Sequence, residues 1–350
     1  MKYFLAALSA AAGVLVLLNP EAVSAAVSDA VRDCLEIMVP SLFAFTVLAI
    51  WLQSSGLYRL VLRPVTLPLS KLLRMEEELC AVIILGNIGG YPVGAKLLSR
   101  LVSENRISRE DAGRMLCCCF GSGPSFVVGI VGTRIFASTA AGLAIFAACF
   151  CSSLIIAAAV RFKGEIRLKD GASAYGFSAE CLTDSVMNGA RVMFTVCVMI
   201  TAFAVFFSLL DILGVIPAAG TFFSLLGAGD LSDGILPALL EISRLKALKP
   251  AAPWVLPLCA GLLSFGGLCV HIQIIALAKS IPLKPFIISR IPAALLSAVL
   301  SLPALLLPQP AAEALAVFTE ARPFSASAVI SACVLIMCGI LLAGKKKKER

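Results

Sequence analysis

A glycine-broken apolar stretch occurs twice in this chain and limits what the chain can fold into. The first copy, residues 85–96, contains Gly89-Gly90-Tyr91-Pro92, and the second, residues 264–273, contains Gly266-Gly267. Neither step continues a regular helix easily, because glycine is conformationally permissive and proline lacks the amide donor. Backbone freed in this way inside hydrocarbon must be buried in protein or line a watery cavity. Glycine-interrupted segments in corresponding positions of two halves point to the substrate site of a transporter.

The composition places the chain in a lipid bilayer. Of its 350 residues, 60% are hydrophobic and 14% are charged, and the mean hydropathy is +0.99. Soluble domains are about 45–50% apolar and about 25% charged. We therefore predict an all-α polytopic membrane protein. The net charge of +8 is concentrated in short loops and in the tail Lys345–Arg350, where it sets membrane orientation, so no nucleic-acid partner is expected.

The chain offers no sign of a metal site or an enzyme site. Its thirteen cysteines lie mostly in apolar runs, where they pack helices as small apolar residues, and none has the spacing of a zinc ligand. There is no P-loop, and Gly121-Ser122-Gly123 lacks the full spacing of a hydrolase nucleophile elbow. We expect no catalytic activity, no cofactor and no bound metal.

Charge and hydropathy predict the path of the first half across the membrane. The apolar run Phe4–Leu18 is read as a retained first span, with a cleavable signal peptide as the alternative. An amphipathic interfacial helix is expected over 29–38, followed by a span over about 41–60. Basic loops flank residues 79–101 on both sides, so this segment is predicted to be a re-entrant hairpin with its tip at the glycine pair.

Two spans, over about 115–136 and 139–160, are predicted next, with a helix break at Gly121–Ser125 and a tight turn at Ala137-Ser138. A cytoplasmic linker is expected over 161–179. The second half is predicted to begin with an amphipathic helix over about 180–191 and a span ending near 211, followed by an irregular stretch over 216–253. A re-entrant hairpin over 254–278 and spans over about 291–307 and 326–343 are predicted to complete it.

This topology has about eight crossings and two re-entrant or broken hairpins, with both termini in the cytoplasm; ten full crossings is the competing count. The matching order of elements predicts an internal repeat. The predicted domains are an N-terminal span (1–27), a first half (28–160), a linker (161–179), a second half (180–307), and a last span with a basic tail (308–350).

Polar residues near the glycine pairs are the candidate substrate-binding residues, because ionisable groups at membrane depth are costly. Each also has an ordinary structural interpretation, such as an interhelical hydrogen bond for His271, a helix-end partner of Arg244 for Glu241, or an interfacial position for Lys96. Arg114 and Arg290 open the spans that follow the two segments, where guanidinium groups suit carboxylates but also set topology. The candidate set is Asn87, Gly89, Gly90, Lys96, Arg114, Glu241, Gly266, Gly267, His271, Gln273 and Arg290.

Several of these motifs, in this order, resemble one known family. They are residues 40–45 (Pro-Ser-Leu-Phe-Ala-Phe), 89–96 (Gly-Gly-Tyr-Pro-Val-Gly-Ala-Lys), 123–129, 239–242 (Leu-Leu-Glu-Ile) and 264–273. Together they resemble the sporulation integral membrane protein YlbJ family, also called SpoVV, from about residue 35 to 305. That family carries nucleoside-recognition "Gate" domains and is similar to concentrative nucleoside transporters.

The resemblance implies a transporter that moves dipicolinic acid out of the mother cell across the outer forespore membrane. Its partners would be a small anionic substrate and the lipid bilayer, with a homo-oligomer possible. The Leu-Glu-Ile-Ser-Arg-Leu stretch at 240–245 and the short basic tail depart from the family pattern. Two other hypotheses stay open, namely nucleoside or nucleobase transport and a non-transporting sporulation or envelope assembly factor.

Overall fold

The protein is helical throughout the part of the chain that its computed structural model describes, which is residues 2–162, 164, 166–169, 178–225, 232–248 and 253–306; these residues contain no strand. Five helices among them are long and apolar enough to cross a membrane. They are Pro20–Ser54, Thr139–Arg161, Ala179–Ile212, Val255–Leu277 and Lys284–Leu306. The predicted all-α polytopic fold is therefore confirmed. The predicted last span, 326–343, lies outside the described residues.

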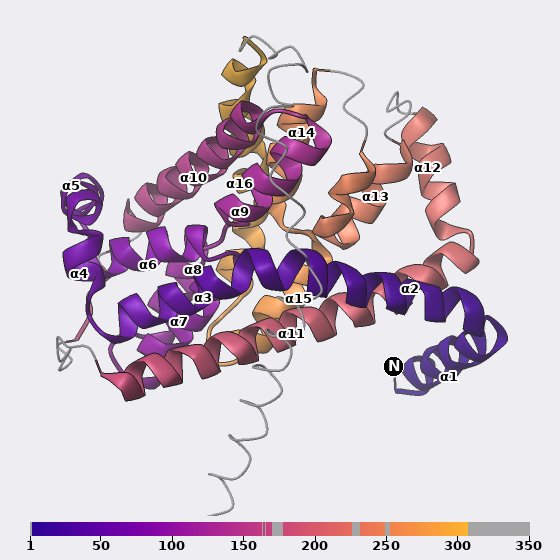
Figure 1. Cartoon of the computed structure of the whole chain (residues 1–350), viewed down its shortest axis with the longest axis horizontal. Helices are drawn as coiled ribbons and strands as arrows, with labels where there is room; N and C mark the ends of the chain where they lie inside the picture. Colours follow the sequence, from indigo (N-terminus) through magenta and orange to yellow (C-terminus); the bar gives the residue numbers. More distant parts are fainter. Residues whose placement is uncertain are drawn as a thin grey trace, which may run out of the picture.

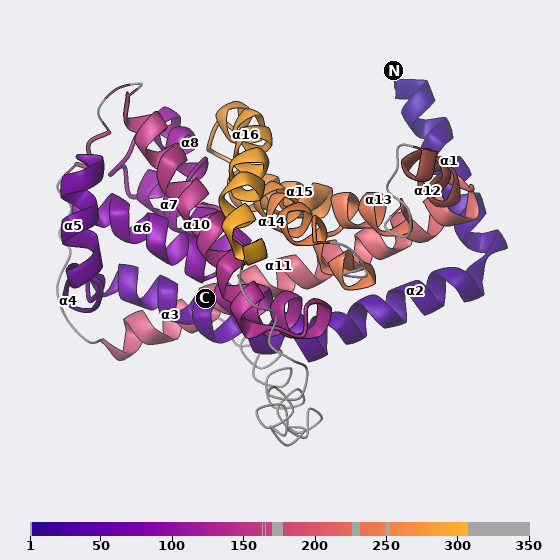
Figure 2. The same ribbon diagram turned by 90° about the horizontal axis from the view of Figure 1, so that it is seen from above.

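Two very long helices run side by side along the molecule (Figures 1 and 2). One consists of α2 (Pro20–Asp33), the π-helical turn η1 (Cys34–Met38) and α3 (Val39–Ser54), and the other is α11 (Ala179–Ile212). We expected separate interfacial helices over 29–38 and 180–191. Instead each amphipathic segment continues into its span, and in the first case the wider π-helical turn carries the helix past Pro40. The shorter helix α1 (Lys2–Leu18) contacts α2 and α11.

The first glycine-broken segment is a helical hairpin, as the sequence predicts. After the short helices α4 (Tyr58–Val61) and α5 (Arg63–Leu73), α6 (Glu77–Ile88) and α7 (Tyr91–Ser103) pack against each other. The chain turns at Gly90, whose φ of +96° is strained for any residue with a side chain. Nearly all of α6 is buried, so the freed backbone at the tip is enclosed by protein.

The next segment is a helix that breaks in its middle. α8 (Arg109–Leu116) ends seven residues before α9 (Pro124–Phe126), which continues as the π-helix η2 (Val127–Ile135). The sequence predicts this break at 121–125, and the structure confirms it over residues 117–123. After a turn at Ala137 (φ +48°), α10 (Thr139–Phe162) begins, and it is long and apolar enough to cross a membrane, as predicted.

The stretch predicted to be irregular, 216–253, is helical over most of its described residues, so that expectation was wrong. It contains α12 (Val215–Leu225), α13 (Ser232–Leu240) and the 3-10 helix η4 (Ile242–Ala247). α13 and η4 contact each other as a second hairpin, and the residue after η4 returns to α13, since a methyl group added at Gly234 would lie 2.5 Å from the Leu248 side chain. The tip of this hairpin is Glu241.

The second Gly-Gly segment differs from the predicted hairpin. It comprises α14 (Val255–Phe265) and α15 (Gly267–Leu277), and α16 (Lys284–Ser301) follows and ends in the 3-10 turn η5 (Leu302–Leu306). α14 packs on α10 and α16, whereas α15 packs on α7, α11 and α13. Because its two parts have different neighbours, this segment is a broken helix that changes direction at its glycines.

The two parts of the chain thus have one order of elements, namely a long helix, a helical hairpin, a broken helix and another long helix. The first set is α3, α6–α7, α8–α9 and α10, and the second is α11, α13–η4, α14–α15 and α16. The hairpin tip at Gly90 therefore corresponds to Glu241, and the break at 264–268 corresponds to the break at 117–123. The sequence analysis paired the two Gly-Gly segments with each other, whereas the order of elements in the structure pairs the first Gly-Gly segment with Glu241 and the second with residues 117–123. The predicted domain limits remain a prediction.

Candidate functional site

The four helix breaks contact one another at the centre of the fold. A methyl group added at Gly123 would lie 3.0 Å from the carbonyl oxygen of Ile88, so the first broken helix touches the first hairpin tip. One added at Gly267 would lie 3.3 Å from the amide nitrogen of Ile242, so the second broken helix touches the second tip. The Tyr91 hydroxyl donates to the Leu263 carbonyl over 2.7 Å and joins the two pairs.

Arg290 lies between the two broken helices and is 1% exposed. Its guanidinium donates to the carbonyl of Cys117 at one break and to that of Ser264 at the other, the latter over 3.3 Å. The same group stacks over the rings of Phe120 and Phe286, with the guanidinium carbon 4.7 and 4.9 Å from their centroids. Nε and Nη2 also donate to the Ser289 hydroxyl, over 3.3 and 3.0 Å, so Arg290, a predicted substrate ligand, is hydrogen-bonded to the two breaks and to its own helix.

His271 belongs to an aromatic cluster beside this arginine. Its ring centroid is 5.0 Å from that of Phe265 and 5.5 Å from that of Phe286. Its Nδ1 lies 2.6 Å from the carbonyl oxygen of Gly267, the glycine that begins α15. This hydrogen bond lies within α15, so among the described residues the structure does not show the interhelical bond that was the structural alternative for His271; its ring contacts reach Phe265 and Phe286 instead.

Asn87 holds the first hairpin against its neighbours. Its side chain is 2% exposed, and Nδ2 donates to the carbonyls of Ile83 (2.8 Å) and Cys118 (3.0 Å). Its Oδ1 accepts from the Ser153 hydroxyl at 3.0 Å. Gly89, at the same tip, offers its carbonyl to the Thr46 hydroxyl at 3.5 Å. With these partners Asn87 positions the tip and the adjacent broken helix.

A small apolar neck of about 30 Å³ lies where the breaks meet, with room for about one water molecule. Its polar lining is Tyr91 and Ser122 from the first half and Glu241 and Gln273 from the second. Gln273 is 3% exposed and donates from Nε2 to the Cys269 sulfur over 3.4 Å. Two predicted site residues, Glu241 and Gln273, are thus brought together here.

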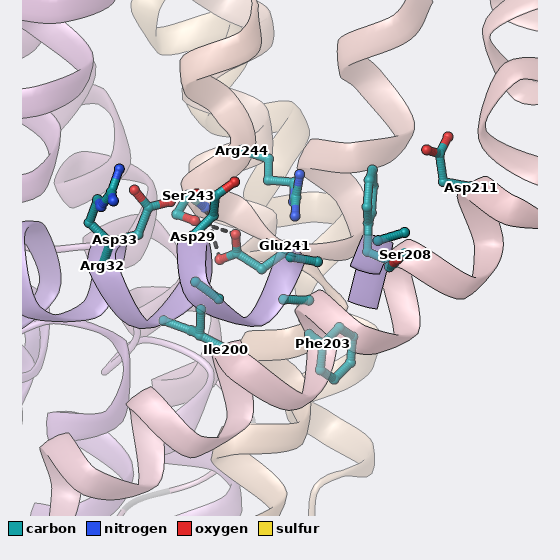
Figure 3. Close-up of a pocket in the computed structure, with 15 residues that line it drawn as sticks. Asp29, Arg32, Asp33, Ile200, Phe203, Ser208, Asp211, Glu241, Ser243 and Arg244 are labelled. Carbon is teal, nitrogen blue, oxygen red and sulfur yellow. Dashed lines mark hydrogen bonds between the residues drawn. The ribbon is translucent and has the colours of Figure 1, made fainter. Parts of the chain in front are cut away.

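A larger cavity of about 590 Å³ opens beside the neck, between α2, α11 and η4 (Figure 3). Two residues, Ile200 and Glu241, line both spaces. Its charged lining comprises Asp29, Arg32, Asp33, Asp211, Glu241 and Arg244. Four carboxyl groups face two guanidinium groups, so this cavity has an acidic balance.

A third cavity, of about 740 Å³, lies at the other end of α11 and contains Lys96. Its neutral polar lining is Ser54, Ser99, Ser103, Ser178, Ser185 and Asn188, and its other charged lining residues are Arg100, Glu180 and Asp184. Among the described residues no carboxylate forms an ion pair with Lys96. Partial burial, with Arg191 and Arg100 nearby, lowers the pKa of its ammonium group. An anion that entered this cavity would therefore gain a charge partner.

Arg114 lies apart from these spaces. It pairs with Asp111 at 2.9 Å and donates to the carbonyls of Val160 (2.9 Å) and Gly164 (2.7 Å). Those contacts tie α8 to the end of α10, and the alternative role of Arg114 in setting membrane topology stays a prediction.

The three cavities follow one another along α11. The Lys96 cavity contacts residues 180–188, the neck contacts Val196 and Ile200, and the acidic cavity contacts residues 200–211. A helix of 34 residues is about 51 Å long, which exceeds the roughly 30 Å thickness of a bilayer core. Between the Lys96 cavity and the neck, Gly189 packs closely on Val47, with 2.6 Å between the position of an added methyl and the valine side chain.

Sequence reasoning missed part of this lining. Asp29 and Asp33 were assigned to an interfacial helix and Asp211 to a span end, and Ser122 was considered only as part of a helix break and as a nucleophile. The alignment of α2 with α11 brings the aspartates together, and no local pattern encodes that pairing. The small Gly-Ser-Gly-Pro run at 121–124 was the available signal for the neck.

Comparison with known proteins gives one informative relative. Over 132 residues, the chain is 32% identical to the sporulation integral membrane protein YlbJ of Bacillus subtilis (strain 168). The aligned part is 37% of this chain and about a third (32%) of that relative's length. No protein-family model matches the chain, and no solved structure matches it. The chain is thus an integral membrane protein with a sporulation membrane protein as its relative.

Proposed function

We propose that this protein is a membrane transporter whose solute moves along α11, from one of its end cavities to the other through the neck. The observation that carries this proposal is the order of the three cavities along one membrane-length helix, with four helix breaks meeting at the narrowest of them. Broken helices supply free backbone groups where a polar solute needs them. Gly189 packs closely on Val47 between the Lys96 cavity and the neck, so solute passage there requires α3 and α11 to move apart.

The solute that we propose is a small organic anion. Lys96 lines the end cavity opposite the acidic one, and among the described residues no carboxylate forms an ion pair with it, although Glu180 and Asp184 line the same cavity. A charge-assisted hydrogen bond to the Lys96 ammonium group contributes about 1.5–3 kcal/mol. Dipicolinate, a planar dicarboxylate, is the anion implied by the family resemblance, and the relative's name refers to sporulation. The proposed location is the outer forespore membrane, with both termini in the cytoplasm.

Flux into liposomes containing the purified protein tests this proposal. Labelled dipicolinate and labelled uridine are offered separately to the wild type, Lys96→Ala and Lys71→Ala; Lys71 is an exposed lysine of α5. We expect saturable dipicolinate uptake in the wild type and in Lys71→Ala. In Lys96→Ala, kcat/KM should fall at least about tenfold, which corresponds to about 1.4 kcal/mol.

Two other outcomes would replace the proposal. Uptake of uridine without dipicolinate would favour nucleoside transport, for which the uncharged Tyr91, Ser122 and Gln273 of the neck are suitable partners. No flux of either solute through folded protein would favour a role in sporulation or envelope assembly.

A further inference from the structure

Glu241 is the one carboxylate among the described residues that lines both the neck and the acidic cavity. It is the tip of the second hairpin, outside the five spanning helices. The residue is 6% exposed, although it has a carboxyl group at the end of a flexible side chain. An ion at such a site must be paired or neutralised. Among the described residues, no cation forms an ion pair with Glu241.

Both hydrogen-bond partners of the carboxyl group belong to Ser243, two positions further along the same hairpin. Oε1 accepts from the Ser243 amide over 3.0 Å, and Oε2 accepts from the Ser243 hydroxyl. The carboxylate thereby caps η4 while facing the cavity (Figure 3). These two bonds hold the side chain in one orientation at the junction of the two spaces.

The surroundings of Glu241 contain more negative than positive groups. The titratable and charged residues that interact with it electrostatically are Asp33 (α2), Cys34 (η1), Tyr91 (α7), Arg244 (η4) and Cys269 (α15), and Asp29, Arg32 (α2) and Asp211 (α11) line the same cavity. Burial raises the pKa of the Glu241 carboxyl, and the hydrogen bonds from Ser243 and the charge of Arg244 oppose this effect. The protonated form is therefore more accessible here than for an exposed glutamate.

Protonation of Glu241 would ease the passage of an anionic solute. A dicarboxylate passing the neck would meet the Glu241 carboxylate at close range, where like charges repel strongly in a medium of low dielectric constant. A neutral carboxyl removes this repulsion and offers a hydrogen-bond donor. We propose that Glu241 carries one proton together with each solute anion, so that the protein is a proton–anion symporter. This inference rests on the proposed function.

The step needs only a proton transfer. With the acidic cavity open, a Glu241 oxygen forms an O–H bond to a proton of a hydronium ion, whose own O–H bond breaks to leave water, and the anion enters beside the neutral carboxyl. When the route opens toward Lys96, the anion leaves first, and the Glu241 O–H then gives its proton to water. For a dianion, one cycle moves a net charge of minus one. The cycle can run in either direction.

A pH gradient tests the coupling in liposomes with the membrane potential clamped at zero. For one proton per anion, each pH unit (acid outside) should sustain about tenfold accumulation of labelled dipicolinate, because both correspond to about 1.4 kcal/mol. In Glu241→Gln the accumulation ratio should fall to one, while exchange of labelled for unlabelled dipicolinate remains measurable. Glu110→Gln, which alters an exposed glutamate of α8, should accumulate like the wild type.

A second variant covers the case in which Glu241→Gln fails to fold. Ser243→Ala removes the hydroxyl that donates to the carboxylate, so it should shift the pH midpoint of gradient-free dipicolinate flux upward. The symport inference is overturned, and the transporter proposal kept, if dipicolinate accumulation by the wild type does not depend on the pH gradient. The same holds if Glu241→Gln still accumulates dipicolinate. An unshifted midpoint in Ser243→Ala also contradicts the symport inference. Absence of dipicolinate flux in the wild type overturns both the symport inference and the transporter proposal.

Discussion

The phenolic oxygen of Tyr91 lies 2.7 Å from the carbonyl oxygen of Leu263, and this hydrogen bond joins residues 172 positions apart in the chain. Tyr91 begins α7 directly after the first hairpin tip, and Leu263 lies in the last turn of α14 before the second broken helix changes direction. One buried hydrogen bond thus couples a break in the first half to a break in the second.

Removing this hydroxyl should weaken the protein without disturbing its packing. Tyr91→Phe keeps the ring that lies 4.7 Å from Phe120 but leaves the Leu263 carbonyl without its donor. A buried acceptor left unpaired costs about 1–3 kcal/mol. Thermal unfolding in detergent should show a lower midpoint for Tyr91→Phe than for Tyr3→Phe, whose residue is 92% exposed. Equal midpoints would show that the bond contributes nothing.

Gly94 is a position at which even one methyl group should be excluded. A methyl group there would lie 1.8 Å from the Cys119 carbonyl oxygen, a backbone atom of the adjacent helix break. Gly94→Ala should therefore destabilise the hairpin by more than about 3 kcal/mol, at the upper end of overpacking costs. Gly129→Ala is the control, since nothing lies within 4 Å of its added methyl group. A folded Gly94→Ala protein with wild-type stability would contradict the close approach of α7 to residue 119.

Arg290 should behave as a structural cation. Arg290→Lys replaces a planar fork that reaches two carbonyls with a single ammonium group, which cannot serve Cys117 and Ser264 with the same geometry. We expect a loss of about 2 kcal/mol in unfolding free energy, within the range for a buried charge that loses a partner. The dipicolinate Kd of the folded fraction should stay within about twofold, and Arg109→Lys, at an exposed residue, is the control. A large change in Kd with unchanged stability would show that Arg290 binds solute.

Lys96 should make anion binding depend on pH in one direction. Anion binding needs the ammonium form, and the pKa of Lys96 lies below its ordinary value, so binding should weaken as pH rises through that lowered pKa. In Lys96→Arg the side chain stays charged, and the loss at alkaline pH should disappear. Equilibrium binding of dipicolinate to purified protein between pH 7 and 10 measures both curves. Identical alkaline losses in the two proteins would remove Lys96 from the binding site.

The sequence predicts the membrane class and the existence of the breaks because both depend on local composition. Gly90 and the run at 121–124 mark positions where a helix cannot continue, and the structure breaks there. The second hairpin tip was not predicted as a tip, because it contains no glycine. Its reversal is made by Glu241 in extended backbone (φ −144°), whose side chain caps η4 through Ser243.

The site was predictable only in part, for a different reason. Glu241 and Gln273 were both named as candidate site residues from the sequence, and both line the neck in the structure. The acidic cavity depends on the alignment of α2 with the far end of α11, and the role of Arg290 depends on which carbonyls two broken helices present to it. Such pairings arise from tertiary packing, which a single sequence does not encode in any short motif.

The most direct test of the route is to fill its neck. Ser122→Phe places a ring in a space of about 30 Å³ that contains Gln273 and Glu241, far from the Lys96 cavity along α11. Dipicolinate flux and dipicolinate binding are then measured on the same preparation, beside Ser9→Phe at an exposed position of α1. The predicted result is flux below about a tenth of the wild type with binding retained within about twofold. Undiminished flux through folded Ser122→Phe protein would show that solute does not pass between the helix breaks.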